Sequence, residues 1–279
     1  MLIIHYMKRK TIIVLFLLAL AGMSHLSWGQ FTPREIAQRS DIEELLKTAK
    51  IIKYEDIGEG VTKPYHLFLS KAGRDIEGCW KNPKGIQSGH LEGWQYEIAA
   101  YEMDKLLDLR MVPPTVERVF SGKKGSLQFW LQGGMNDLVR QEQNINIPKE
   151  HLNRWIKRKY LTRAFDCLIA NEDRTQQNIR YTDDWRTILI DHSRSFRSSV
   201  KFTKQLMYGR NGIMGVKLIR QLPREFAAKI KDLDFEKIKN AVGPLLKDKE
   251  IKAILKRKEL LLKDIEEMIK EIGEHNFYY

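Results

Sequence analysis

A lysine and a glutamate stand sixteen residues apart at positions where they could hold a phosphorylated ligand. Lys81 ends a strand-like run over residues 75–81, and Glu97 lies early in a helix expected over residues 94–109. Cys79 shares a face with Lys81, because side chains two apart in a strand point the same way. A strand lysine can bind nucleotide phosphates when a buried acid orients its ammonium group. A solvated surface pair would show the same pattern, so this alternative stays open here.

A second group of polar residues follows farther along the chain. Asp173 and Asn178 are an acid and an amide five residues apart, and Asp191 follows an apolar strand over residues 188–190. Phosphoryl transfer needs an acid near the attacking hydroxyl and oxygen ligands for Mg²⁺ or Mn²⁺. These three residues supply that set. An ordinary hairpin with Asx turns would have a similar composition, and it remains the alternative for this segment.

The elements that must position these residues fall into two groups. Strand-like runs cover residues 51–57, 65–69, 75–81, 115–120 and 127–131. A polar, glycine-bearing loop is expected before the helix over residues 94–109. After a glycine hinge at residues 132–134 the pattern predicts a helix over 152–170, a hairpin over 182–190 and helices from 223 onward. The sequence therefore predicts an α+β protein in which a small antiparallel β lobe precedes a larger helical lobe.

The first 29 residues have the organisation of a signal peptide. The basic run Lys8-Arg9-Lys10 precedes an uncharged stretch over residues 11–23, and Ser27 and Gly29 are the small residues before a cut. The apolar core is shorter than the roughly 20 residues of a membrane-spanning helix, although an uncleaved membrane anchor is the alternative. We thus expect a signal peptide over 1–29, a β-rich lobe over 30–133 and a helical lobe over 134–279.

Several segments resemble the secretory-pathway kinases related to Golgi casein kinase and xylose kinase. The similar segments are EIAAY (97–101), DKLL (104–107), VPP (112–114), DCLIANEDR (166–174) and IDHSRSF (190–196). They look like the family's helix and following turn, its catalytic loop and its metal loop. The Asp-Arg pair followed by Asn178 is also similar to HipA-type toxin kinases and phosphatidylinositol kinases. The resemblance implies a two-lobed protein-kinase-like fold.

The resemblance also implies an ATP site on the β lobe. Lys81 would contact the ATP phosphates, and Glu97 would pair with Lys81 or reach a second metal. Gly58 and Gly60 would form a loop over the phosphates, where the absence of Cβ allows close backbone approach. Cys79 would face the adenine because it shares the face of Lys81.

The same resemblance assigns roles in the helical lobe. Asp173 would accept or orient the proton of the acceptor hydroxyl, and Asn178 and Asp191 would hold Mg²⁺ or Mn²⁺. The chain departs from the family at Thr175, where relatives usually carry His, and at His192-Ser193, where the usual pair ends in Gly. Neither change removes an acid or amide needed for the metal, which favours an active kinase over a pseudokinase.

Charge adds one further function class. The formal net charge is +12, of which Lys8, Arg9 and Lys10 supply three, so the chain from residue 30 carries +9. A basic surface protein that binds nucleic acid or anionic envelope polymers without chemistry is one alternative. A pseudokinase serving as a nucleotide-binding module and a kinase-like enzyme that transfers AMP are two others.

The leading hypothesis is an exported kinase that transfers the γ-phosphoryl group of ATP to a hydroxyl on a protein or glycan. Export would place it in the periplasm, outside the cell or in a secretory lumen. No specific nucleic-acid partner is expected. Membrane contact is expected only if the signal segment is uncleaved.

Overall fold

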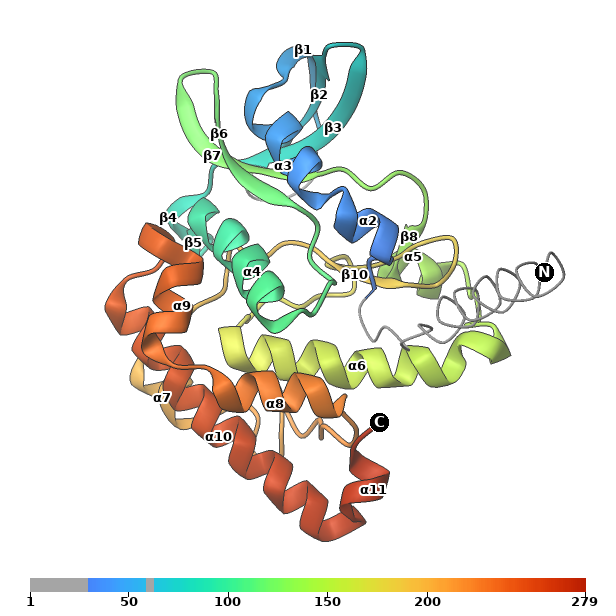
Figure 1. Cartoon of the computed structure of the whole chain (residues 1–279), viewed down its shortest axis with the longest axis vertical. Helices are drawn as coiled ribbons and strands as arrows, with labels where there is room; N and C mark the ends of the chain where they lie inside the picture. Colours follow the sequence, from blue (N-terminus) through green and yellow to red (C-terminus); the bar gives the residue numbers. More distant parts are fainter. Residues whose placement is uncertain (1–29, 59–62) are drawn as a thin grey trace, which may run out of the picture.

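The computed structural model describes residues 30–58 and 63–279. Within these ranges, a five-stranded antiparallel sheet with the order β1-β2-β3-β7-β6 lies at one end of the molecule, and helices fill the other end (Figure 1). The strands are β1 (Lys50–Asp56), β2 (Tyr65–Lys71), β3 (Arg74–Lys81), β6 (Thr115–Phe120) and β7 (Lys123–Phe129). The predicted signal peptide over 1–29 lies outside the described residues.

Helix α3 (Arg39–Thr48) covers one face of this sheet, and the short helix α2 (Pro33–Ala37) precedes it. Every second side chain along β2 and β3 points toward α3. The buried side chains that form the small core include Leu45, Leu46, Leu67, Leu69, Ile76, Trp80 and Leu127. Full burial of an aliphatic side chain of this kind contributes about 1.5–3 kcal/mol to the free energy of folding. The opposite face of β3, which carries Cys79 and Lys81, is left free to line a site.

A β-hairpin occupies the segment that the sequence predicted to be a polar loop. Strands β4 (Lys84–Gln87) and β5 (His90–Gly93) pair antiparallel around Ser88 and Gly89. These two turn residues have φ angles of 47° and 82°, which is the conformation of the tight turn that suits a hairpin's twist. The prediction of a loop was wrong, because the two-residue turn Ser88-Gly89 is enough to join two antiparallel strands.

Helix α4 (Trp94–Leu107) starts directly after β5 and lies between the sheet and the helical lobe (Figure 1). It packs on β6 and β7 on one side and on α8 and α9 on the other. The Tyr96 hydroxyl donates a 2.7 Å hydrogen bond to Glu250 Oε1, which fixes the helix to the C-terminal region. The helix ends two residues before the predicted position because Asp108 adopts a left-handed φ of 53°. Helix α4, which carries Glu97, therefore packs against both lobes.

The helical lobe begins at β8, which joins a small three-stranded sheet with the order β10-β9-β8. Its elements are β8 (Met135–Asn136), α5 (Asp137–Glu142), α6 (Lys149–Ile169), β9 (Ile179–Tyr181), β10 (Thr187–Leu189), α7 (Val200–Lys204), α8 (Arg224–Asp232), α9 (Phe235–Val242), the 3₁₀ turn η1 (Gly243–Leu245), α10 (Asp248–Ile272) and α11 (Glu274–Phe277). Gly134 before β8 has a φ of 68°, and a Cβ there would lie 2.1 Å from the Tyr181 carbonyl oxygen. The link between the lobes therefore requires glycine. In the part of the chain that the structure describes, no helix is long and apolar enough to cross a membrane.

Candidate active site

Lys81, at the end of β3, lies between two carboxylates. Its Nζ is 3.4 Å from Glu97 Oε1 and 3.0 Å from Asp191 Oδ1, and the side chain is 13% exposed. Burial alone would lower the pKa of Lys81, but the charges of Asp191 and Glu97 outweigh burial and raise it. The lysine is therefore a fixed positive charge of the kind that binds phosphate oxygens.

Glu97 uses both carboxylate oxygens. Oε1 faces Lys81, and Oε2 accepts a 2.8 Å hydrogen bond from the backbone N–H of His192. Burial would raise the pKa of Glu97, but Lys81 and His192 lower it, so the carboxyl group is ionised. The His192 ring is fully buried, and burial lowers its pKa. Its Nε2 lies 2.9 Å from Arg174 Nη2 and accepts that hydrogen bond, since arginine can only donate.

Asp173 lies in the loop after α6 and faces an arginine. Arg194 Nη1 is 3.5 Å from Asp173 Oδ2, while Arg194 Nε donates to Glu92 Oε1 at 2.9 Å. Burial raises the pKa of Asp173; Arg194 opposes this shift, and the carboxylates of Asp191 and Glu92 add to it. A raised pKa makes the Asp173 carboxylate a stronger proton acceptor. Glu92 comes from the hairpin that was predicted to be a loop, so the sequence did not reveal this residue.

Arg174 connects the segments that carry the other predicted residues. Its Nε and Nη2 donate to the two oxygens of the buried Asp166, each at 3.0 Å. Its Nη1 donates to the carbonyl oxygens of Asn178 at 2.9 Å and Ile190 at 2.8 Å. The Asn178 side-chain amide in turn donates to the Asp173 carbonyl at 2.7 Å. One arginine thus ties α6 to the loop of Asp173 and to the residue before Asp191.

The charges around Asp191 suit a divalent cation. The cluster holds two cations, Lys81 and Arg194, and four carboxylates, Glu92, Glu97, Asp173 and Asp191. With all of these groups charged, the formal charge is −2. No group of three or more His, Cys, Asp or Glu within residues 30–58 and 63–279 is arranged to hold a metal ion by itself. A metal held by Asn178 and Asp191 would therefore take its other ligands from phosphate or water oxygens, as Mg²⁺ commonly does.

The sheet face beside Lys81 supplies a less polar surface. Cys79 is a free, half-buried thiol opposite His66 in the register of β3 and β2, and burial raises its pKa to about 11. The His66 ring stacks on Trp130 with 4.0 Å between the ring centroids. Gly58 follows β1 with a φ of 72° and donates its N–H to Asp56 Oδ1 at 2.8 Å. Gly58 thus lies in the connection between β1 and β2, whereas Gly60 falls outside the described residues.

Comparison with solved structures relates this arrangement to known folds. Hydra Fam20, in a structure with sugar, matches with a TM-score of 0.62 and 15% identity, over 87% of this chain and 92% of that one. The Golgi casein kinase with Mn and ADP bound also matches with a TM-score of 0.62 and 15% identity, over 90% of this chain and 80% of that one. The chain has a protein-kinase-like fold. No protein-family model and no curated protein matches the sequence.

The predicted resemblance to Golgi casein kinase is thus confirmed at the level of the fold. The predicted α+β architecture, with an antiparallel β lobe and a helical lobe, is present as well. The structure brings Lys81 into contact with Glu97 and Asp191, and Asp173 lies close enough to Asp191 for their charges to interact. Their roles toward a nucleotide, a metal and an acceptor remain predictions.

Proposed function

We propose that the protein is an exported atypical kinase that transfers the γ-phosphoryl group of ATP to a hydroxyl on a protein or glycan. This proposal rests on the ammonium group of Lys81, which lies 3.4 Å from Glu97 Oε1 and 3.0 Å from Asp191 Oδ1. A largely buried lysine that two acids from different elements hold in place is positioned to bind phosphate oxygens.

The residues of the cluster divide the work of transfer between them. Lys81 would orient the ATP phosphates, with Glu97 holding the lysine in place. Asp173 would take the proton of the acceptor hydroxyl while the hydroxyl oxygen bonds to the γ-phosphorus. The bond between the γ-phosphorus and the oxygen that bridges to the β-phosphorus breaks, and ADP leaves. Arg194 would keep Asp173 ionised through the contact of 3.5 Å between them.

A divalent metal fits the residues that are present. Asn178 and Asp191 would hold Mg²⁺ or Mn²⁺, which when bound neutralises charge on the phosphates. The formal charge of −2 on the cluster supports this, because one divalent cation balances it. The likeness to the Golgi casein kinase with Mn and ADP bound supports the use of a divalent metal together with a nucleotide.

The sheet beside Lys81 would receive the adenine. Cys79 and the stacked rings of His66 and Trp130 form its half-buried surface. A stacked aromatic pair offers a flat face of the kind on which a base can pack. Gly58 would contribute to a loop over the phosphates.

Export and the acceptor rest on other grounds. The signal-peptide organisation of residues 1–29 supports export, as does the likeness to a Golgi kinase. The resemblance to Golgi casein kinase and xylose kinase supports a hydroxyl on a protein or glycan as the acceptor. Amino-terminal sequencing of the protein recovered outside the cytosol tests export, and a mature chain that starts at Gln30 is expected.

Labelled ATP tests the reaction itself. The protein is incubated with Mn²⁺ and either γ- or α-labelled ATP, first alone and then with casein and xylose-bearing glycans. We expect label to be transferred from γ-labelled ATP only. Transfer from α-labelled ATP would indicate AMP transfer, and no transfer from either would leave a nucleotide-binding pseudokinase.

A further inference from the structure

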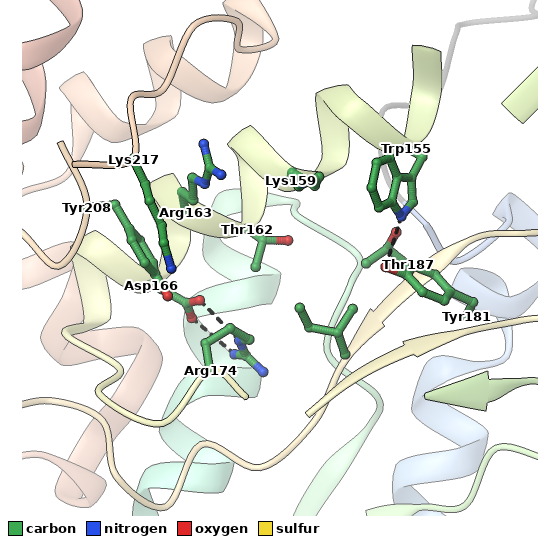
Figure 2. A pocket seen from close by; sticks show the side chains of 11 residues that line it. Trp155, Lys159, Thr162, Arg163, Asp166, Arg174, Tyr181, Thr187, Tyr208 and Lys217 are labelled. Atoms are coloured by element: carbon green, nitrogen blue, oxygen red, sulfur yellow. Dashed lines mark hydrogen bonds and ion pairs between the residues drawn. The ribbon is translucent and has the colours of Figure 1, made fainter. Parts of the chain in front are cut away.

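A second pocket lies in the helical lobe beside the Asp166–Arg174 pair. It has a volume of about 300 Å³, and its walls come from α6, the β9–β10 hairpin and the segment around residues 208–217 (Figure 2). Its lining, among the described residues, does not include Lys81, Glu97 or Asp191. The pocket is therefore distinct from the cluster described above. Its size is at the lower end for sites of small organic ligands.

The lining of this pocket has an excess of positive charge. Lys159, Arg163 and Lys217 all line it, and no carboxylate in the described part of the chain lies within ion-pair distance of any of them. The acid in the lining, Asp166, is already held by both arms of Arg174. The formal charge of the lining is therefore +3. Burial lowers the pKa of Lys159, nearby Arg163 adds to this shift, and Asp137 opposes it from beyond ion-pair distance.

Other groups in the lining suit the rest of a ligand. Thr187 is 4% exposed, and its hydroxyl has no hydrogen-bond partner within the described ranges. A buried hydroxyl without a partner costs stability unless a ligand or water satisfies it. Trp155, Tyr181 and Tyr208 supply aromatic walls around the cations (Figure 2). Lys159 Nζ lies 4.4 Å from the centroid of the Trp155 ring, so the charge and the ring are adjacent.

We propose that this pocket binds a small organic phosphate at a site separate from the ATP site. Three cations without acidic partners provide charge-assisted hydrogen bonds to phosphate oxygens, which are the stronger kind. The aromatic walls provide apolar contact for the organic part of the ligand. A free nucleotide–metal complex is a poorer fit, because the pocket lacks unpaired acids to hold a metal.

Arg174 places the two sites in contact through one side chain. It lines the pocket, and it also donates to the carbonyl oxygens of Asn178 and Ile190. A phosphate that draws Arg174 toward it would shift the backbone that carries Asn178 and Asp191. Occupancy of the pocket therefore alters nucleotide affinity. This coupling rests on the proposed function, whereas binding to the pocket does not.

Calorimetry with phenyl phosphate tests the binding step. The titration is made with EDTA and without nucleotide, so that metal-dependent binding at Lys81 does not contribute. We expect saturable binding that weakens at least about tenfold in the double variant Lys159→Ala/Lys217→Ala. Lys252→Ala/Lys256→Ala, which removes two exposed lysines of α10 outside the pocket, should bind as the unaltered protein does. Lys81→Ala should also leave phenyl phosphate binding unchanged.

Three results would overturn the proposal. These are no saturable binding up to about 10 mM, equal weakening in the two lysine pairs, or loss of binding in Lys81→Ala. Inorganic phosphate is the companion probe, and affinity equal to that of phenyl phosphate would exclude the role of the aromatic walls. ATP titrations with Mn²⁺, at zero and saturating phenyl phosphate, test the coupling. An unchanged ATP affinity would exclude the coupling, while a protein that binds phenyl phosphate but not ATP would refute only the proposed kinase function.

Discussion

The cluster around Lys81 and the pocket beside Arg174 are built from similar residue types with opposite balances of charge. In the cluster each cation faces two acids: Lys81 contacts Glu97 and Asp191, and Arg194 contacts Glu92 and Asp173. In the pocket Lys159, Arg163 and Lys217 face rings, a carbonyl oxygen and one another. The cluster is thus formally −2 and the pocket +3.

The difference in charge determines what each site can bind. A site with an excess of carboxylates repels a bare phosphate and accepts it together with a metal cation. A site with unpaired cations accepts the phosphate alone. Arg174 contacts both sites. It pairs with Asp166 in the pocket, and it donates a hydrogen bond to the Asn178 carbonyl oxygen in the loop next to the cluster.

Removal of one carboxylate from the cluster should have the largest effect. Asp191→Asn keeps the shape of the side chain but removes the charge that faces Lys81 and would face the metal. We expect label transfer from γ-labelled ATP to fall at least about 10³-fold. Asp75→Asn, at an exposed position of the same strand β3 as Lys81, is the control and should retain activity. Comparable activity in the two variants would contradict the assignment of Asp191.

Asp173→Asn tests whether Asp173 accepts the proton of the acceptor hydroxyl or instead helps to bind the nucleotide and metal. Turnover should fall about 10²- to 10⁴-fold, because the general base is lost. The affinity for ATP with Mn²⁺ should change little, because Lys81 and Asp191 remain. Steady-state kinetics together with nucleotide titration measure both quantities. If affinity falls as steeply as turnover, Asp173 belongs to the metal site instead.

Arg174→Ala tests the side chain that joins the two regions. The variant leaves the buried Asp166 without its ion-pair partner, and both side chains are at most 3% exposed in the structure. We expect the free energy of unfolding, measured with urea, to fall by about 3 kcal/mol. Arg34→Ala, at an exposed arginine of α2, should change it by less than about 0.5 kcal/mol. Equal effects would show that Arg174 does not brace the loops.

The charge balance in the cluster should also be visible in the pH profile. Asp173 accepts a proton only when ionised, and Arg194 holds its pKa down against burial and the nearby carboxylates. Arg194→Met should therefore raise the pKa of Asp173 further, and the acidic limb of the plot of kcat against pH should move to higher pH. Arg194→Lys, which keeps the charge, should move the limb less. A limb that stays in place or moves to lower pH would contradict the role of Arg194.

The smallest effect concerns the face of the sheet next to Lys81. Burial raises the pKa of Cys79 to about 11, so its thiol labelling should speed up about tenfold per pH unit below that value. ATP with Mn²⁺ should slow the labelling if the nucleotide covers this face. Cys167, which is fully buried, serves as an internal control for unfolding. Equal labelling rates with and without nucleotide would place the adenine elsewhere.

Local patterns in the sequence predicted much of the fold. Alternation along β3 predicted the shared face of Cys79 and Lys81, and helical spacing placed Glu97 in α4. The β4–β5 hairpin was missed, and Glu92 with it, although the Ser88-Gly89 dipeptide is a turn signal. Strand β7 also begins earlier than predicted, at Lys123.

The remaining features depend on contacts between distant segments. The pocket brings Lys159 of α6 together with Lys217, and no local spacing relates these two residues. Arg174 was recognised as part of a motif, but its four hydrogen bonds to Asp166, Asn178 and Ile190 form only when three segments pack together. Tertiary packing, rather than propensity, decides such contacts.

The site assignment is tested most directly by the melting temperature with ATP, with and without Mn²⁺, of the unaltered protein and of Asp191→Asn. A ligand that binds only the native state stabilises it. Because the cluster is formally −2, we expect ATP with Mn²⁺ to raise the melting temperature far more than ATP alone, and we expect Asp191→Asn to lose this metal dependence. An identical metal-dependent rise in both proteins would contradict the assignment of the site.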